Sequence, residues 1–237
     1  MCSGVRSARM AAEFVDLTHE FHDGMPGFRM RGEDGEAIEY TAEIRPFLTH
    51  EETRPMYDGQ ASFEITEIAF QTSVGTYLDA PAHRFPGERD VADLALDELV
   101  HDGIVVDVRD REPYEAVDES VLPADVDLAG KAVLFNFGWD AYWGTEAYRE
   151  YPYVSEALVD RLVAEEVALI GVDTINVDDD RNPARPAHTK LLGDGTPIVE
   201  NLRGLDALSN HGFRFHAVPI PAVDAAAMPV RAYAEIR

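Results

Sequence analysis

The sequence predicts an α/β fold built on a mixed sheet. Short apolar runs typical of buried central strands occur three times, at 104–108, 132–137 and 167–173. A helix is predicted between the last two runs, because Ser155 is a suitable N-cap and apolar residues follow it at helical spacing: Leu158, Val159, Leu162 and Val163. Strands that alternate with helices along one chain are characteristic of α/β domains.

Strands are also predicted before and after this central region. Residues 213–220 form a last apolar run. The segment SFEITEIAF, Ser62–Phe70, changes the phase of its apolar side chains halfway, which predicts a bulge near Thr66 or burial on both faces. Gly75 then ends the strand ahead of a turn at 79–83.

The length of 237 residues suits one substantial domain, which we place at residues 14–237 after a flexible leader at 1–13. No apolar run is long enough for a membrane helix, and the leader has no hydrophobic stretch typical of a secretory signal. The single cysteine, Cys2, excludes an intrachain disulfide and a thiolate zinc site. A cytoplasmic location is therefore expected.

The charge is strongly acidic, with 45 acidic against 20 basic residues and a formal net charge of −25. Such a surface repels phosphates, which argues against nucleic acid as a partner. The excess of carboxylates has two interpretations. It is either an ordinary acidic surface or an adaptation to high salt, where screening relieves the repulsion.

Polar residues able to do chemistry follow the predicted strands, where α/β proteins place their sites. Asp79 and His83 follow the 62–70 strand, Asp173 ends the 167–173 strand, and His188 and Glu200 come later, with His188 in a predicted loop. One Asp, two His and one Glu suit a divalent ion and general base catalysis. Each also has a structural interpretation: a turn aspartate, solvated histidines, and a glutamate that begins a helix.

The arrangement of these residues resembles the cyclase family of metal-dependent hydrolases, which includes kynurenine formamidases (arylformamidases) and isatin hydrolases. The family motif His-x-Gly-Thr-His-x-Asp-x-Pro-x-His aligns with SVGTYLDAPAH, Ser73–His83. Further matching blocks run from about Asp16 to the C-terminus, and they are VDLTHEFHDGMP, FGWDAYWG, GVDTINVD, HTKLLGDGTPIVENLRGLDAL and AVPIPAVDAAAMPVRAYA. The resemblance implies a swivelling β/β/α-type domain and a homodimer or larger homo-oligomer.

By this resemblance, Asp79, His188 and Glu200 are metal ligands and His83 is the catalytic acid/base. Ser73 and Tyr77 occupy the positions of the family's first two histidines. A hydroxyl or phenol binds zinc poorly at neutral pH, because it must first lose a proton with a high pKa. The family's two-metal site is therefore not expected here.

Three functions remain open from the sequence. Asp79, His188 and Glu200 hold one zinc, manganese or magnesium ion in a hydrolase of a small amide, lactam or lactone. Alternatively, Tyr77, His83 and Glu200 form a metal-free proton-transfer site in a lyase, isomerase or cyclising enzyme. The third possibility is a small-molecule-binding protein without turnover. In each, Ser73 and Phe28 are candidates for substrate contact.

Overall fold

A computed structural model describes residues 12–31 and 34–237, so most of the expected leader at 1–13 lies outside the described residues. The body is built on one nine-stranded sheet with the order β1-β15-β13-β7-β9-β11-β12-β6-β14. The strands of this sheet are β1 (Glu13–Asp16), β6 (Tyr77–Asp79), β7 (Val100–Asp107), β9 (Ala132–Asn136), β11 (Leu169–Val172), β12 (Ile198–Glu200), β13 (Phe213–His216), β14 (Ala227–Pro229) and β15 (Tyr233–Ile236).

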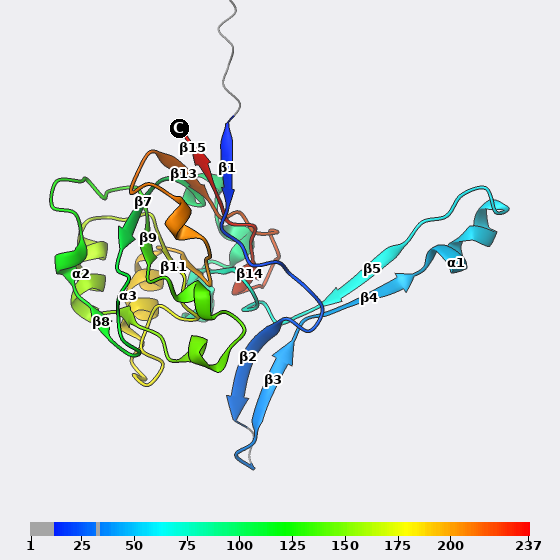
Figure 1. Cartoon of the computed structure of the whole chain (residues 1–237), viewed down its shortest axis with the longest axis horizontal. Helices are drawn as coiled ribbons and strands as arrows, with labels where there is room; N and C mark the ends of the chain where they lie inside the picture. The colour runs from blue at the N-terminus through cyan, green and yellow to red at the C-terminus, as the bar shows by residue number, and fades with distance from the viewer. Residues whose placement is uncertain (1–11, 32–33) are drawn as a thin grey trace, which may run out of the picture.

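The sheet is mixed, as the sequence predicts. Strands β7, β9, β11 and β12 are parallel neighbours, whereas β6 pairs antiparallel with both β12 and β14. The predicted helix is α2 (Glu156–Ala164), and the side chain of Ser155 accepts a hydrogen bond from Leu158 N at 3.2 Å. It packs beside α3 (Pro186–Asp194) on one face of the sheet (Figure 1).

The strands bury both faces, because their alternate side chains enter different clusters. In β9, Val133 and Phe135 join the cluster under α2 and α3, while Ala132 and Leu134 join the cluster on the other face. The buried stretch of such a strand is therefore apolar at consecutive positions, as in 132–135, and this is why it forms a continuous apolar run in the sequence.

Two hairpins leave the body (Figure 1). The first pairs β2 (Pro26–Arg31) with β3 (Ala37–Thr41). The second, which we call the arm, pairs β4 (Glu43–Leu48) with β5 (Ile65–Ala69) and carries the short helix α1 (His50–Thr53) near its tip. The remaining strands, β8 (Ala116–Val117) and β10 (Tyr153–Val154), form a small parallel pair.

The arm decides between the two alternatives predicted for 62–70, a bulge near Thr66 or burial on both faces. Burial on both faces is wrong, because all five residues of β5 are exposed. The irregularity does fall opposite Thr66 and Ile65, where the register shifts between Pro46 and Leu48 on the partner strand. The two-sided apolar pattern therefore marks a ribbon that projects from the body, not a core strand.

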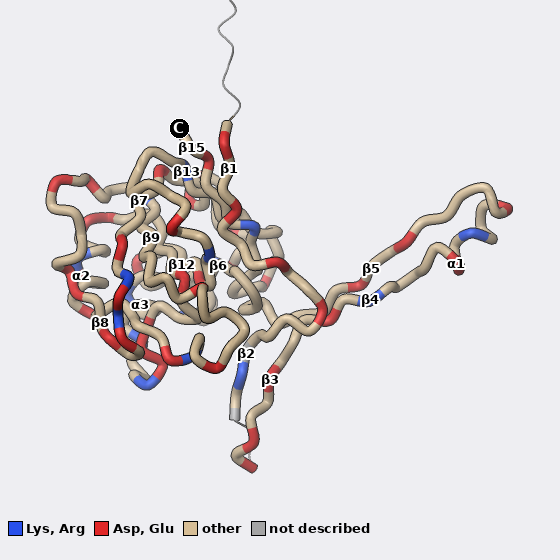
Figure 2. Tube along the Cα trace, in the orientation of Figure 1, with Lys and Arg blue, Asp and Glu red and all other residues tan. Residues whose placement is uncertain are grey.

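Acidic residues are distributed along the body and both hairpins, with basic residues scattered among them (Figure 2). In the described part of the chain, no helix is long and apolar enough to cross a membrane. The adaptation to high salt stays a prediction. It implies a melting temperature that rises from dilute buffer to molar potassium chloride, whereas an ordinary acidic surface gives a flat response.

Candidate active site

Two neighbouring strands position the acidic side of the site. In the antiparallel pair β6–β12, Tyr77 lies opposite Glu200 and Asp79 lies opposite Ile198. Directly opposite residues, and residues two apart on one strand, share a face of a sheet. Tyr77, Asp79 and Glu200 therefore all point to the face that α3 covers, and both carboxylates are fully buried.

His188 reaches this face from the first turn of α3, so its predicted place in a loop is wrong. Pro186 begins the helix, and Asp178 accepts hydrogen bonds from Ala187 N at 2.7 Å and His188 N at 3.0 Å. These are two of the N–H groups that have no partner within a helix. Asp178 caps the helix although it lies eight residues before the first helical residue. Sequence patterns identify a cap only when it directly precedes the helix, so this helix was not predicted.

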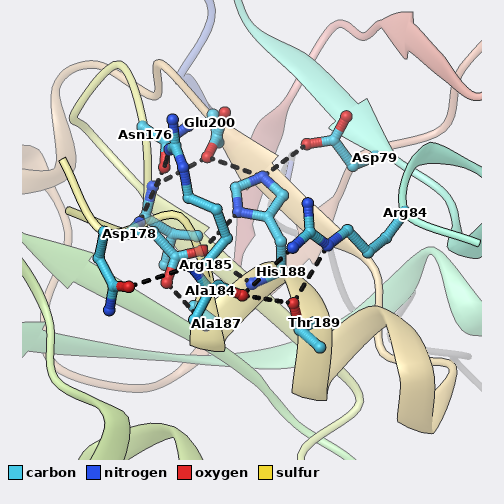
Figure 3. A network of polar contacts seen from close by, with 12 residues as sticks. Asp79, Arg84, Asn176, Asp178, Ala184, Arg185, Ala187, His188, Thr189 and Glu200 are labelled. Carbon is cyan, nitrogen blue, oxygen red and sulfur yellow. Dashed lines mark hydrogen bonds and ion pairs between the residues drawn. The ribbon is translucent and has the colours of Figure 1, made fainter. Parts of the chain in front are cut away.

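The same carboxylate fixes the imidazole. His188 Nδ1 lies 2.8 Å from Asp178 Oδ2, which directs Nε2 towards the two strands (Figure 3). There Nε2 lies 3.6 Å from Asp79 Oδ2 and 3.6 Å from Glu200 Oε1. A carboxylate behind a histidine is the usual support for an imidazole that binds a metal ion.

His83 approaches Asp79 from the opposite side. It ends a short 3₁₀ turn, Pro81–His83, directly after β6, and its Nδ1 lies 3.2 Å from Asp79 Oδ1. About 35% of its side chain is exposed. One ring nitrogen of His83 is thus held by a buried carboxylate, which leaves Nε2 as the nitrogen that can exchange protons with substrate or water.

Glu200 is tied to Tyr77 and to the backbone. The Tyr77 hydroxyl donates a very short hydrogen bond to Glu200 Oε2, and Val177 N donates to Oε1 at 2.8 Å. Burial of the carboxylate raises the pKa of Glu200 to about 7. Burial, followed by the negative charges of Glu200 and Asp79, holds the pKa of Tyr77 well above its ordinary value, so its hydroxyl remains a donor.

His188 carries the compensating positive charge. Burial lowers its pKa, but the hydrogen bond to Asp178 and the nearby carboxylates of Asp79 and Glu200 outweigh this effect and raise the pKa to about 10. At neutral pH the imidazole is therefore protonated, with three carboxylates and the ring of His83 beside it. A metal ion that binds here takes the place of a proton on Nε2.

The donor set fits one divalent ion. Both oxygens of Asp79 are buried and accept no hydrogen bond of good geometry from the described residues. A buried carboxylate in this state is costly unless a cation compensates it. One ligand atom from each of Asp79, His83 and His188 lies within 4.8 Å of the others. Glu200 Oε1 also approaches the group, at 3.6 Å from His188 Nε2. His83 is therefore within reach of an ion as well as in the expected place of an acid/base.

The remaining predicted residues lie apart from this cluster. Ser73 is half-buried beside the turn and lines a neighbouring cleft. The side chain of Phe28 lies outside the described part of the structure. Asp173 has a structural role, because its carboxylate accepts hydrogen bonds from the backbone N–H groups of Phe137, Gly138 and Trp139.

Two residues of the site were missed by sequence reasoning. Asp178 orients His188. The sequence feature that could have identified it is the acidic residue that ends the GVDTINVD block, ahead of the segment that contains His188. Asn201 adopts a left-handed backbone with φ 57°. Its Nδ2 donates to Gly75 O at 2.7 Å, and its Oδ1 accepts from the Tyr148 hydroxyl at 2.8 Å. Asn201 thereby fixes the turn that precedes Tyr77.

Gly75 has a definite reason to be glycine in this turn. Its φ of +62° lies in the left-handed region, and a Cβ would lie 2.9 Å from Met25 Sδ. The turn thus keeps the backbone geometry that the motif demands, although Ser73 and Tyr77 replace histidines on either side of it.

A cleft of about 910 Å³ lies beside the site. Tyr77 and Asn201 are among its lining residues, together with the aromatic residues Trp143, Tyr148 and Tyr151. The β2–β3 hairpin forms another side and is joined to the 146–149 segment by two ion pairs: Arg29 with Glu146 at 3.1 Å, and Arg149 with Glu39 at 2.8 Å. The cleft has room for a small aromatic molecule next to Tyr77.

Comparison with known proteins identifies the family. The family model described as "Putative cyclase" matches residues 15–179. A kynurenine formamidase of Geobacillus thermodenitrificans is 30% identical over 173 residues, which are 72% of this chain and 79% of that protein. The chain belongs to the cyclase family.

Solved structures share the fold. An isatin hydrolase A from Ralstonia solanacearum has a TM-score of 0.81 at 23% identity, covering 95% of this chain and 92% of that one. A protein described as a predicted metal-dependent hydrolase from Bacillus stearothermophilus has a TM-score of 0.73 at 20% identity, covering 96% and 100% of the two chains. These likenesses confirm the predicted fold class.

Proposed function

We propose that this chain is a hydrolase that opens a small amide, lactam or lactone with the help of one divalent ion. Membership of the cyclase family and the names of its relatives support a hydrolase of C–N bonds. The single observation that carries the proposal is Asp79, a fully buried carboxylate that accepts no hydrogen bond from the described residues and lies between two imidazoles. Such a group is poised to bind a cation.

Asp79, His188 and Glu200 would hold the ion, as zinc, manganese or magnesium. When bound, such an ion polarises a carbonyl oxygen and lowers the pKa of a water molecule. Asp178 keeps His188 in the tautomer whose Nε2 faces the ion. Two carboxylates and one imidazole form a hard donor set, which suits manganese or magnesium as well as zinc.

His83 and Tyr77 would move the protons. His83 Nε2 takes a proton from the attacking water while Asp79 steadies Nδ1. A new C–O bond forms, the C–N bond of an amide or lactam (or the ester C–O bond of a lactone) breaks, and His83 returns the proton to the leaving nitrogen or oxygen. In the reaction, the Tyr77 hydroxyl would turn its one hydrogen from Glu200 to the oxyanion that develops on the former carbonyl, as a phenol in a water-poor pocket can.

His83 has a second possible role as third ligand in place of Glu200. The variant His83→Gln separates the two roles. If His83 is the acid/base, the variant retains its metal content and loses turnover. If His83 is a ligand, metal content and turnover fall together.

A metal-independent enzyme is the second candidate function, and the protonated His188 favours it. This imidazolium already neutralises Asp79 and Glu200 in part. His83, Tyr77 and Glu200 would then transfer protons in a lyase, isomerase or cyclising reaction. A binding protein without turnover would use the same cleft.

Hydrolysis assays separate these functions. The protein would be assayed with an aryl formamide, a lactam and a lactone, after chelation and after addition of manganese or zinc. The proposal predicts hydrolysis that chelation removes and metal restores. Hydrolysis that survives exhaustive chelation contradicts the metal site, and a lack of turnover with every metal and substrate contradicts the hydrolase.

We further propose that the chain forms a homodimer or larger assembly through the arm. Its apolar side chains are exposed, with Phe47 62% and Met56 63% accessible. An isolated two-stranded ribbon is marginally stable in water, so a second copy of the chain would supply the burial that the arm lacks. Light scattering tests this: Phe47→Glu should yield a smaller species, and a wild-type monomer would contradict it.

A further inference from the structure

Arg185 differs from the other arginines on the wall of the cleft. Arg29 and Arg149 each pair with a glutamate across the cleft. Arg185 also lines the cleft and is half-buried, yet no carboxylate among the described residues lies within 4.0 Å of its guanidinium. In a chain with a net charge of −25, an arginine without an acidic partner beside a candidate active site requires an explanation.

The structure holds this side chain in place through Asn176. Arg185 Nη1 donates to Asn176 Oδ1 at 3.1 Å, and the same oxygen accepts from Asp178 N at 2.9 Å (Figure 3). Asp178 in turn holds His188. One amide thus ties Arg185 to the segment that orients the candidate metal ligand, and within the described residues the guanidinium makes no other hydrogen bond.

The backbone of Arg185 is strained to achieve this. It adopts φ 45° and ψ 63°, a left-handed conformation that a non-glycine residue rarely takes. The residue also precedes Pro186, which disfavours compact conformations and adds to the cost. Strain of this kind is found where the function requires a particular side-chain position.

We propose that Arg185 binds the carboxylate of an acidic substrate and so sets the specificity of the cleft. A guanidinium fork matches a carboxylate in two parallel hydrogen bonds. Trp143, Tyr148 and Tyr151 on the same cleft would contact an aromatic or apolar body, and Tyr77 marks the reacting end. The inference rests on the proposed hydrolase. It narrows the substrate to an amide, lactam or lactone that carries a carboxylate.

Steady-state kinetics on a matched pair of substrates test this specificity. The pair is formanilide and 4-formamidobenzoate, which differ by one carboxylate. Arg185→Gln should raise KM for 4-formamidobenzoate about tenfold to a hundredfold, the range for a charged hydrogen bond, with kcat nearly unchanged. The KM for formanilide should stay within about twofold. Arg185→Lys should recover part of the loss, because it retains charge without the fork.

Arg181→Gln is the matched control. It removes the same charge four residues earlier, from an exposed side chain that pairs with Asp179 at 2.7 Å and does not line the cleft. It should leave KM for both substrates unchanged. Equal effects of Arg185→Gln on the two substrates, or equal effects of the two variants, would overturn the inference.

A binding measurement keeps the inference separate from the proposed reaction. Titration calorimetry of the purified protein with benzoate and with benzamide requires no turnover. Benzoate should bind more tightly than benzamide to the wild type and to Arg181→Gln, and this preference should vanish in Arg185→Gln. If the preference follows Arg185 but neither formamide is hydrolysed, the hydrolase proposal fails and the carboxylate site stands. A benzoate affinity that Arg185→Gln leaves intact overturns the site.

Discussion

The two sides of the candidate site are built in different ways. On one side, Asp79, His188 and Glu200 retain the residue types of the family motif, all three are buried, and Asp178 fixes the central imidazole. On the other side, Ser73 and Tyr77 replace histidines. Tyr77 is nevertheless connected to the retained residues, because its hydroxyl donates a hydrogen bond to Glu200. Under the proposed function, this difference would give a site with fewer metal ligands than the family motif and with a phenol in the position of one histidine.

The largest expected effect comes from the retained side. Asp79→Asn keeps the volume of the side chain but removes the buried negative charge. It should lower the bound metal and reduce kcat/KM by roughly a thousandfold or more, because ligand and support for His83 are both weakened. Elemental analysis and kinetics measure the two losses. Asp206→Asn, an exposed change of the same type, is the control, and equal behaviour of the two variants would contradict the role of Asp79.

A smaller loss of activity is expected from a change at Tyr77, which replaces one of the family histidines. Tyr77→Phe removes only the hydroxyl, so turnover should fall by about a hundredfold while the metal content stays the same. Circular dichroism should show that the variant is folded. A variant that turns over normally would mean that the phenol is only a structural donor to Glu200.

The support behind His188 can be tested separately. Asp178→Asn should weaken metal affinity by about tenfold to a hundredfold, as loss of a carboxylate behind a metal-binding histidine typically does. Added metal should therefore restore much of its activity, unlike that of Asp79→Asn. If excess metal leaves the variant inactive, Asp178 acts chiefly through the helix cap at Ala187 and His188.

The pKa of His188 predicts how stability changes with pH. Because its folded-state pKa of about 10 lies above the ordinary histidine value of 6.5, the contribution of His188 to the free energy of unfolding is fully present below pH 6.5. That contribution is lost as pH rises towards 10. The raised pKa of Glu200, about 7, acts in the same direction at lower pH. The chelated protein should therefore lose roughly 5–10 °C in melting temperature between pH 6.5 and 10.

Added metal should reverse this trend, because the ion competes with the proton on His188 and so stabilises more as pH rises. Differential scanning calorimetry with and without manganese or zinc measures both slopes. His188→Gln should flatten the slope of the chelated protein. A chelated wild type that is equally stable at pH 6.5 and pH 10 would contradict the raised pKa of His188.

The sequence predicted the parts of the structure that local patterns determine. The apolar runs at 104–108, 132–137 and 167–173 correspond to β7, β9 and β11, because the part of a strand that is buried on both faces is apolar at consecutive positions. The exposed arm strand β5 carries a similar pattern, so burial could not be inferred from periodicity alone. The helix that carries His188 was also missed, since its cap comes from Asp178 across a turn and not from the residue directly before it.

The site itself was predicted only through the family motif. Spacing alone does not show that β6 pairs with β12, which brings Tyr77 and Glu200 together from positions 123 residues apart. Nor does it show that Asp79 lacks hydrogen-bond partners, because that depends on packing from α3. The geometry of the site could not be predicted from residue types alone, because it depends on long-range strand pairing and on the capping of α3.

The central claim is that the retained side holds one divalent ion. Elemental analysis by mass spectrometry, after dialysis of the purified protein against manganese or zinc, tests this most directly. The account predicts one ion per chain in the wild type. The double variant Ser73→His/Tyr77→His restores the family residues and should approach two. The metal site would be contradicted if the wild type binds no ion and the Asp79→Ala variant turns over normally. The metal-free reaction around His83 would then be the remaining account.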